Sequence, residues 1–133
     1  MSAEANGAVG LLLSDDLMFT SRIIATARQL GLEIRTAGAQ AGLEKLAEQQ
    51  APRCVILDLS NRGLDVGALI RRLREACPQP PFVVGYGSHV DTATLRAARE
   101  AGCDLVLPRS KFVDELPKAL PDWVAGRKGD SAC

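Results

Sequence analysis

Short apolar runs alternate along this sequence with longer segments in which apolar residues recur at helical spacing. The run at 54–58, Cys-Val-Ile-Leu-Asp, is apolar at every position before its final acid. A run of this kind is typical of a strand that is buried on both faces of a parallel sheet. The predicted strands are 8–14, 32–35, 54–58, 82–84 and 104–108, and the predicted helices are 17–30, 41–50, 66–76, 92–101 and 110–120.

Residues that start and stop helices stand at several of these boundaries. Asp65 and Asp91 can cap the third and fourth helices, and Gly102 can end the fourth. Pro117 and Pro121 are expected to interrupt the last helix, because proline has no backbone N–H to donate. One strand followed by one helix, repeated five times, predicts an α/β domain whose parallel sheet is covered by helices on both faces.

The composition sets limits without naming a function. With 133 residues, of which 47% are hydrophobic and 24% charged, the chain is most simply one domain with an ordinary core. We expect this domain to span 8–124, between a flexible leader at 1–7 and a flexible tail at 125–133. Sixteen basic and sixteen acidic side chains cancel, so there is no electrostatic reason to expect binding to nucleic acid or to an anionic membrane.

The sequence shows neither a membrane span nor a signal peptide. No apolar run approaches the ~18 residues of a membrane helix, and the first residues are small and polar. The four cysteines, Cys54, Cys77, Cys103 and Cys133, form no Cys-x-x-Cys pair, which disfavours a zinc site and a disulfide framework. Free thiols are typical of a reducing cytosol, so we expect a cytoplasmic protein.

Acidic residues follow two of the predicted strands. Asp58 ends the third strand, and Asp15 and Asp16 follow the first. Because the carboxyl ends of parallel strands meet at one edge of a sheet, we expect these three acids to converge. A lone aspartate at such a place is more often a helix cap, but a second acidic cluster favours a metal site. Gly85 and Gly87 belong to no phosphate-binding motif, so a nucleotide site has little support.

With Asp15 and Asp16 after the first strand, Asp58 after the third and a basic residue after the fifth, the chain resembles the receiver domains of bacterial response regulators. The resemblance covers roughly 8–120, and it is strongest in detail at 97–107, AAREAGCDLVL. It implies a flavodoxin-like, three-layer α/β/α fold with five parallel strands in the order 2-1-3-4-5. It also implies two-component (phosphorelay) signal transduction, in which a histidine kinase or a small acyl phosphate phosphorylates an aspartate.

In such a domain Asp58 would be the phosphoacceptor, because an aspartate carboxylate can attack phosphorus to form an acyl phosphate. The resemblance assigns a Mg²⁺ ion to Asp15, Asp16, Asp58 and the backbone carbonyl of Ser60. Magnesium prefers oxygen ligands and neutralises the charge that develops on phosphoryl oxygens. We expect its binding to be weak.

The sequence departs from the pattern of the family at several places. Arg109 stands where the family has lysine, and its planar fork does not replace an ammonium conservatively. Gly87 stands where the family has threonine or serine, and Ser88 could supply the hydroxyl only if the loop shifts by one residue. Val106 takes the usual aromatic place and Arg62 the usual proline place. The hydroxyl-plus-aromatic switch is therefore expected to be lost.

These departures favour an atypical single-domain receiver, or pseudo-receiver, that signals by protein–protein interaction with reduced or absent phosphorylation at Asp58. The alternatives are a working phospho-receiver and, as a second one, a flavodoxin-like protein that binds a small ligand. We expect a protein partner such as a histidine kinase, with a homodimer left open, and no enzyme activity. Arg109 could pair with Asp58 in the absence of a metal, and Tyr86 and Trp123 are expected to be packing residues.

Overall fold

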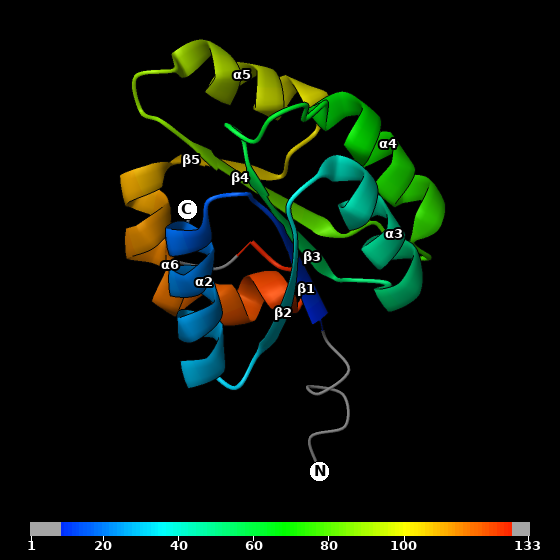
Figure 1. Ribbon diagram of the computed structural model, residues 1–133, viewed down its shortest axis with the longest axis horizontal. Helices are drawn as coiled ribbons and strands as arrows, with labels where there is room; N and C mark the ends of the chain where they lie inside the picture. The colour runs from blue at the N-terminus through cyan, green and yellow to red at the C-terminus, as the bar shows by residue number, and fades with distance from the viewer. Residues whose placement is uncertain (1–8, 129–133) are drawn as a thin grey trace.

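The computed structural model describes residues 9–128, which form one parallel sheet with helices on both faces (Figure 1). The sheet has five strands in the order β2-β1-β3-β4-β5, which confirms the expected flavodoxin-like order. The strands are β1 (Val9–Leu13), β2 (Glu33–Ala37), β3 (Cys54–Asp58), β4 (Phe82–Gly87) and β5 (Leu105–Pro108), and the helices are α2 (Leu17–Gln29), α3 (Gln40–Gln50), α4 (Val66–Ala76), α5 (Thr92–Ala101) and α6 (Arg109–Val124). The expected leader and residues 129–133 of the expected tail lie outside the described residues.

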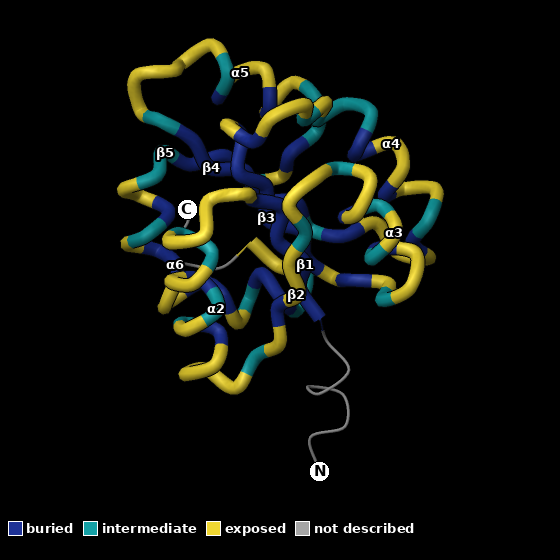
Figure 2. Tube along the Cα trace, viewed as in Figure 1, coloured by how far each residue is buried: buried dark blue, intermediate teal, exposed yellow. Residues whose placement is uncertain are grey.

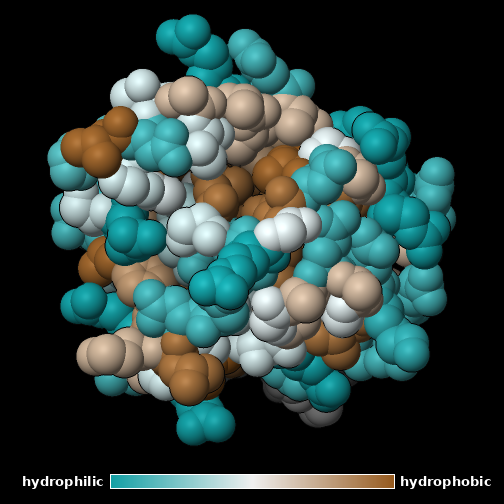
Figure 3. All heavy atoms as spheres, turned by 45° about the horizontal axis from the view of Figure 1, so that its top comes forward, coloured by the Kyte–Doolittle hydropathy of each residue, from teal (hydrophilic) through white to brown (hydrophobic). Residues whose placement is uncertain are grey.

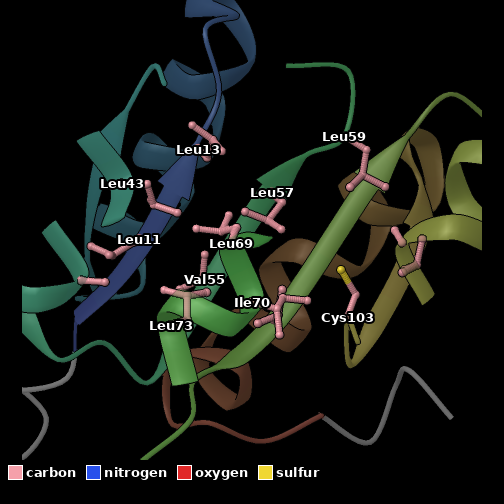
Figure 4. Packing of buried hydrophobic residues seen from close by; sticks show 14 of the residues in the cluster. Leu11, Leu13, Leu43, Val55, Leu57, Leu59, Leu69, Ile70, Leu73 and Cys103 are labelled. Atoms are coloured by element: carbon pink, nitrogen blue, oxygen red, sulfur yellow. The ribbon is translucent and has the colours of Figure 1, made fainter. Parts of the chain in front are cut away.

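Each strand shares its apolar side chains between two cores. Val55 and Leu57 pack with α3, α4 and α5, whereas Cys54 and Ile56 pack with α2 and α6. This alternation follows from the two-residue period of a strand, and it explains why β3 is apolar throughout. The first core is drawn in Figure 4, and Figure 2 shows the buried strands in the middle of the molecule.

The expected caps are formed. The Asp65 and Asp91 carboxylates accept hydrogen bonds from backbone N–H groups in the first turns of α4 and α5, and Gly102 ends α5 in the left-handed conformation. Strand β3 has the expected bounds, β4 ends three residues later than the expected 84, and the other strand boundaries differ by at most two residues, with β5 beginning at Leu105. Asp104 precedes it, and its carboxylate accepts a hydrogen bond from the backbone N–H of Val83.

The prediction that Pro117 and Pro121 interrupt the last helix was wrong. Helix α6 continues through Pro117 and Pro121 to Val124. Each proline removes one helical hydrogen bond, but both rings are exposed on the outer side of the helix. The opposite side compensates for the lost bonds because it is buried against the sheet through Phe112, Leu116, Ala119, Leu120, Trp123 and Val124.

Residues 125–128, which the sequence placed in a tail, turn back onto α6. The indole Nε1 of Trp123 donates to the carbonyl of Lys128 at 3.0 Å, and Arg127 pairs with Asp122 at 2.9 Å. Within 9–128, no helix has the length and apolar character that a bilayer span requires.

The three described cysteines, Cys54, Cys77 and Cys103, are buried free thiols. Burial, and next the charge of Asp104, raise the pKa of Cys103 to about 12, and burial also raises the pKa of Cys54 and Cys77. Because the thiolate is the reactive form, these thiols should react with a disulfide reagent at about pH 8 far more slowly in the folded than in the urea-unfolded protein.

A Cys133→Ser variant removes the thiol outside the described residues from this measurement. Since the folded-state pKa lies above the unfolded one, the stability that these thiols contribute is complete below about pH 8.5 and is lost as the pH rises toward 12. Equal labelling rates in the folded and unfolded protein would contradict this assignment.

Candidate functional site

Asp58 lies at the carboxyl end of β3 as predicted, and it is 3% exposed. Its Oδ1 accepts hydrogen bonds from the backbone N–H of Ser60 at 3.0 Å and from the Ser60 hydroxyl at 2.6 Å. Its Oδ2 accepts one from the Ser14 hydroxyl at 2.8 Å. A carboxylate has about four lone-pair positions, so most of the acceptor capacity of Asp58 is used within the protein.

Ser14 connects Asp58 to the other two acids. While its Oγ donates to Asp58, it accepts a hydrogen bond from the backbone N–H of Asp16 at 3.1 Å. The backbone N–H of Asp15 donates to Oδ1 of the buried Asn61 at 2.7 Å, three residues after Asp58. The structure therefore brings the segments that carry the three acids together at one edge of the sheet.

The side chains of Asp15 and Asp16 are exposed, and that of Asp16 is engaged as a helix cap. Its Oδ1 accepts a hydrogen bond from the backbone N–H of Phe19 at 3.0 Å. Within residues 9–128, no group of three or more His, Cys, Asp or Glu side chains forms a metal-binding cluster. The oxygen donors suit Mg²⁺, but the ion would compete with Ser14 and Ser60 for Asp58, so the ligand set stays a prediction of weak binding.

Arg109 does not pair with Asp58. Its guanidinium carbon lies 5.8 Å from the centre of the Phe19 ring, in a cation–π arrangement, and it makes no ion pair with a described residue. The expected substitute for a metal cation is therefore not formed in this structure.

Leu59 and Leu95 lie beside Gly87, at distances that leave room for a Cβ atom. A Cβ atom on Gly87 would lie 3.5 Å from the Leu59 Cβ, and one on Gly85 only 3.2 Å from the Leu59 Cδ2. Leu59 therefore packs over two glycines, at the end of β3 in Figure 4. The Ser88 hydroxyl accepts a hydrogen bond from the Val90 backbone N–H at 3.3 Å, so it is used within its own loop.

The structure also locates the other positions that the sequence analysis singled out. Val106 is buried in the same core as Leu59, whereas Arg62 is exposed in a loop. The backbone N–H of Ser60 points to Asp58. Among the residues of this paragraph, Ser60 alone makes a hydrogen bond or ion pair with Asp58 within 9–128.

The residues that sequence reasoning missed as members of the site are Ser14, Asn61 and Tyr86. Tyr86 is the Cα partner of Asp58 in the β3–β4 register, and its ring forms a cluster with those of Phe19 and Phe112, at centroid distances of 4.9 and 4.5 Å. Loss of solvation, and next the charge of Asp58, raise the pKa of the Tyr86 phenol well above its ordinary value. Smaller effects of Ser14 and Arg109 lower this pKa.

Apolar groups are also exposed near the acids. Leu17 and Met18 directly follow Asp16 and are 80% and 86% exposed, and Val90 in the β4–α5 loop is 75% exposed. A groove between α4 and α5 is lined by residues that include Leu59, Leu64, Val66 and Ala98. Figure 3 shows a face on which hydrophobic residues lie around a central hollow among hydrophilic ones.

Comparison with known proteins gave one curated relative and many solved structures, while no family model matches the sequence. The chain is 29% identical over 113 residues to the photosynthetic apparatus regulatory protein RegA of Cereibacter sphaeroides. This alignment covers 83% of the chain but 59% of RegA, so the chain spans less than two thirds of that relative.

Two solved structures illustrate the likeness in fold. The receiver domain of NtrX from Brucella abortus has a TM-score of 0.73 at 24% identity, over 87% of this chain and 98% of that one. A chain from the co-crystal structure of the Saccharomyces cerevisiae histidine phosphotransfer protein Ypd1 with the receiver domain of Ssk1 has a TM-score of 0.73 at 14% identity, over 88% of each. With these TM-scores over most of its length, the chain has the fold of a response-regulator receiver domain.

Proposed function

We propose that this chain is an atypical receiver module of two-component signal transduction, which acts by binding a protein partner and in which phosphorylation of Asp58 is reduced or absent. The observation that carries the proposal is the engagement of both Asp58 oxygens by Ser14 and Ser60 in a carboxylate that is 3% exposed. A carboxylate must present a lone pair to phosphorus to act as a nucleophile, and here those donors compete for it.

Two further observations support reduced phosphoryl transfer. Arg109 lies over Phe19 and makes no ion pair with Asp58, so this cation is not placed against the carboxylate. Gly87 has no side chain and therefore offers no hydroxyl to a group on Asp58. Positive charge and hydroxyl donors that face the transferred group are the means by which a protein stabilises phosphoryl transfer.

Binding of a partner is supported by the exposed apolar residues Leu17, Met18 and Val90 at the edge that holds Asp58. A histidine phosphotransfer protein or histidine kinase is the proposed partner class, because the similar Ssk1 receiver was crystallised with Ypd1. A second copy of the chain is the other candidate. The module is proposed to be cytoplasmic and without enzymatic turnover, and the balanced charge gives no support for binding nucleic acid.

Incubation with acetyl phosphate and Mg²⁺, read by intact mass, tests this proposal. In the reaction a bond forms between an Asp58 oxygen and phosphorus while the phosphorus–oxygen bond to acetate breaks, and acetate leaves with the electron pair. We expect an adduct on a small minority of molecules at most. A Ser14→Ala variant should carry more adduct, because one Asp58 oxygen loses its donor.

Asp58→Asn gives the background of this measurement. Ser21→Ala, which removes an exposed hydroxyl from α2, is the matched control for Ser14→Ala and should behave as the wild type. Complete modification of the wild-type protein that is lost in Asp58→Asn would overturn the reduced-phosphorylation proposal and favour a working phospho-receiver.

A further inference from the structure

Tyr86 carries a hydroxyl that the fold buries without satisfying. The residue is 0% exposed, and its Oη makes no hydrogen bond of good geometry among residues 9–128, although the Ser14 hydroxyl lies near enough to lower the pKa of the phenol. Burying a hydroxyl without a partner is unfavourable, since the group has lost its bonds to water. Such a group in the middle of a well-packed aromatic cluster requires a reason beyond packing, because phenylalanine would fill the same space.

The position of Tyr86 places it beside Asp58. The two residues are Cα partners in neighbouring parallel strands, so their side chains lie on the same face of the sheet, toward α2 and α6. Ser14 directly follows β1, the neighbour of β3 on its other side, and it donates to Asp58 Oδ2. The rings of Phe19 and Phe112 both contact the Tyr86 ring, which places that ring on the α2/α6 face.

The charged groups of the site act on the phenol. After the loss of solvation, Asp58 has the largest influence on the pKa of Tyr86, and Arg109 and Asp16 also contribute. A phenol is protonated at neutral pH in any case, so its O–H is available as a donor, either to the nearby Ser14 hydroxyl or to a group carried by Asp58. Oδ2 of Asp58 accepts a single protein hydrogen bond, from Ser14, so it retains room for a ligand.

We propose that the Tyr86 hydroxyl donates a hydrogen bond to a phosphoryl group, or to a mimic of one, that is carried by Asp58. The Tyr86 hydroxyl would reach this group from the α2/α6 face of the sheet. It would make the hydrogen bond that Gly87, which has no side chain, does not provide. The inference rests on the proposed receiver function and applies to whatever fraction of the protein carries such a group. Tyr86 is a positioning residue in this role, since Asp58 alone forms the bond to the ligand.

Titration with fluoroberyllate in the presence of Mg²⁺, followed by ¹⁹F NMR, tests the inference without requiring phosphoryl transfer. The carboxylate oxygen donates an electron pair to beryllium and displaces a fluoride, which leaves the fluorines of the complex as hydrogen-bond acceptors. In Tyr86→Phe, which keeps the ring, we expect the dissociation constant to rise about tenfold, as for loss of one hydrogen bond to a charged group.

Thr20→Val is the matched control. Thr20 Oγ1 is the other buried hydroxyl oxygen without a partner in residues 9–128, and nothing places it against Asp58. This variant should bind fluoroberyllate as the wild type does. Urea unfolding of both variants checks the fold, and Tyr86→Phe should be no less stable than the wild type, because it removes an unsatisfied buried group.

Equal affinity of Tyr86→Phe and wild type would overturn the inference and leave Tyr86 as a packing residue. Absence of any fluoroberyllate binding to the folded wild-type protein would also overturn it, while the proposed function through association would stand. Conversely, complete phosphorylation by acetyl phosphate would overturn the proposed reduction of phosphoryl transfer without deciding the role of Tyr86.

Discussion

Replacing Trp123 by alanine is expected to lower the free energy of unfolding by about 3–5 kcal/mol. The indole is 0% exposed and stacks on Phe112 with ring centroids 5.7 Å apart. It lies beyond both prolines of α6, in the part of the helix that has lost backbone hydrogen bonds. Removing it leaves a cavity in the α2/α6 core and takes away the packing that holds the last turns on the sheet.

Urea denaturation followed by far-UV circular dichroism measures this effect, because the chain has one tryptophan and the variant loses its fluorescence signal. Trp123→Phe is the control, because it keeps an aromatic ring beside Phe112 but loses the hydrogen bond to Lys128. It should lower the free energy of unfolding by about 1 kcal/mol. A loss below 1 kcal/mol in Trp123→Ala would mean that α6 does not depend on this contact.

The architecture was predictable because several local signals agree with one another. The apolar run that ends at Asp58, the caps at Asp65 and Asp91 and the stop at Gly102 were each read correctly from the sequence. They depend on interactions within a few residues, such as a carboxylate that accepts the backbone N–H groups of the next turn. The strand order came from the family resemblance, because periodicity does not specify which strands are neighbours.

The continuation of α6 could not be read in the same way. A proline predicts the loss of one helical hydrogen bond, but it does not reveal how much apolar surface the other side of the helix buries. In the structure Leu116, Leu120 and Trp123 are buried while Pro117 and Pro121 face outward. Tertiary packing thus outweighs the local preference of the prolines.

The site was predicted in outline and missed in detail for a similar reason. Counting along the sequence located Asp58 and Ser60, but Ser14 and Tyr86 lie beside Asp58 across the sheet, and placing them requires the register. Ser14 is two residues beyond Leu12 on β1, and Tyr86 is two beyond Val84 on β4, so both face the same side as Asp58. Strand parity combined with the strand order would have identified them.

Exchanging Asp58 for asparagine is expected to lower the free energy of unfolding by about 1–3 kcal/mol in the absence of divalent ions. The carboxylate accepts bonds from Ser14 and from the N–H and hydroxyl of Ser60, and an amide would turn its own N–H₂ toward at least one of these donors. If repulsion from Asp15 and Asp16 dominated at Asp58, removing its charge would instead raise the stability.

Urea unfolding in EDTA, followed by Trp123 fluorescence, distinguishes the two signs. Asp15→Asn is the matched control, since it removes an exposed charge whose carboxylate makes no hydrogen bond or ion pair with residues 9–128, and its effect should stay within about 0.5 kcal/mol. A more stable Asp58→Asn protein would show that the acids are held together against their repulsion, as in a site prepared for a cation. A less stable one would support Asp58 as a hydrogen-bonded structural acid, for which phosphorylation requires the loss of bonds that hold the loop after β3.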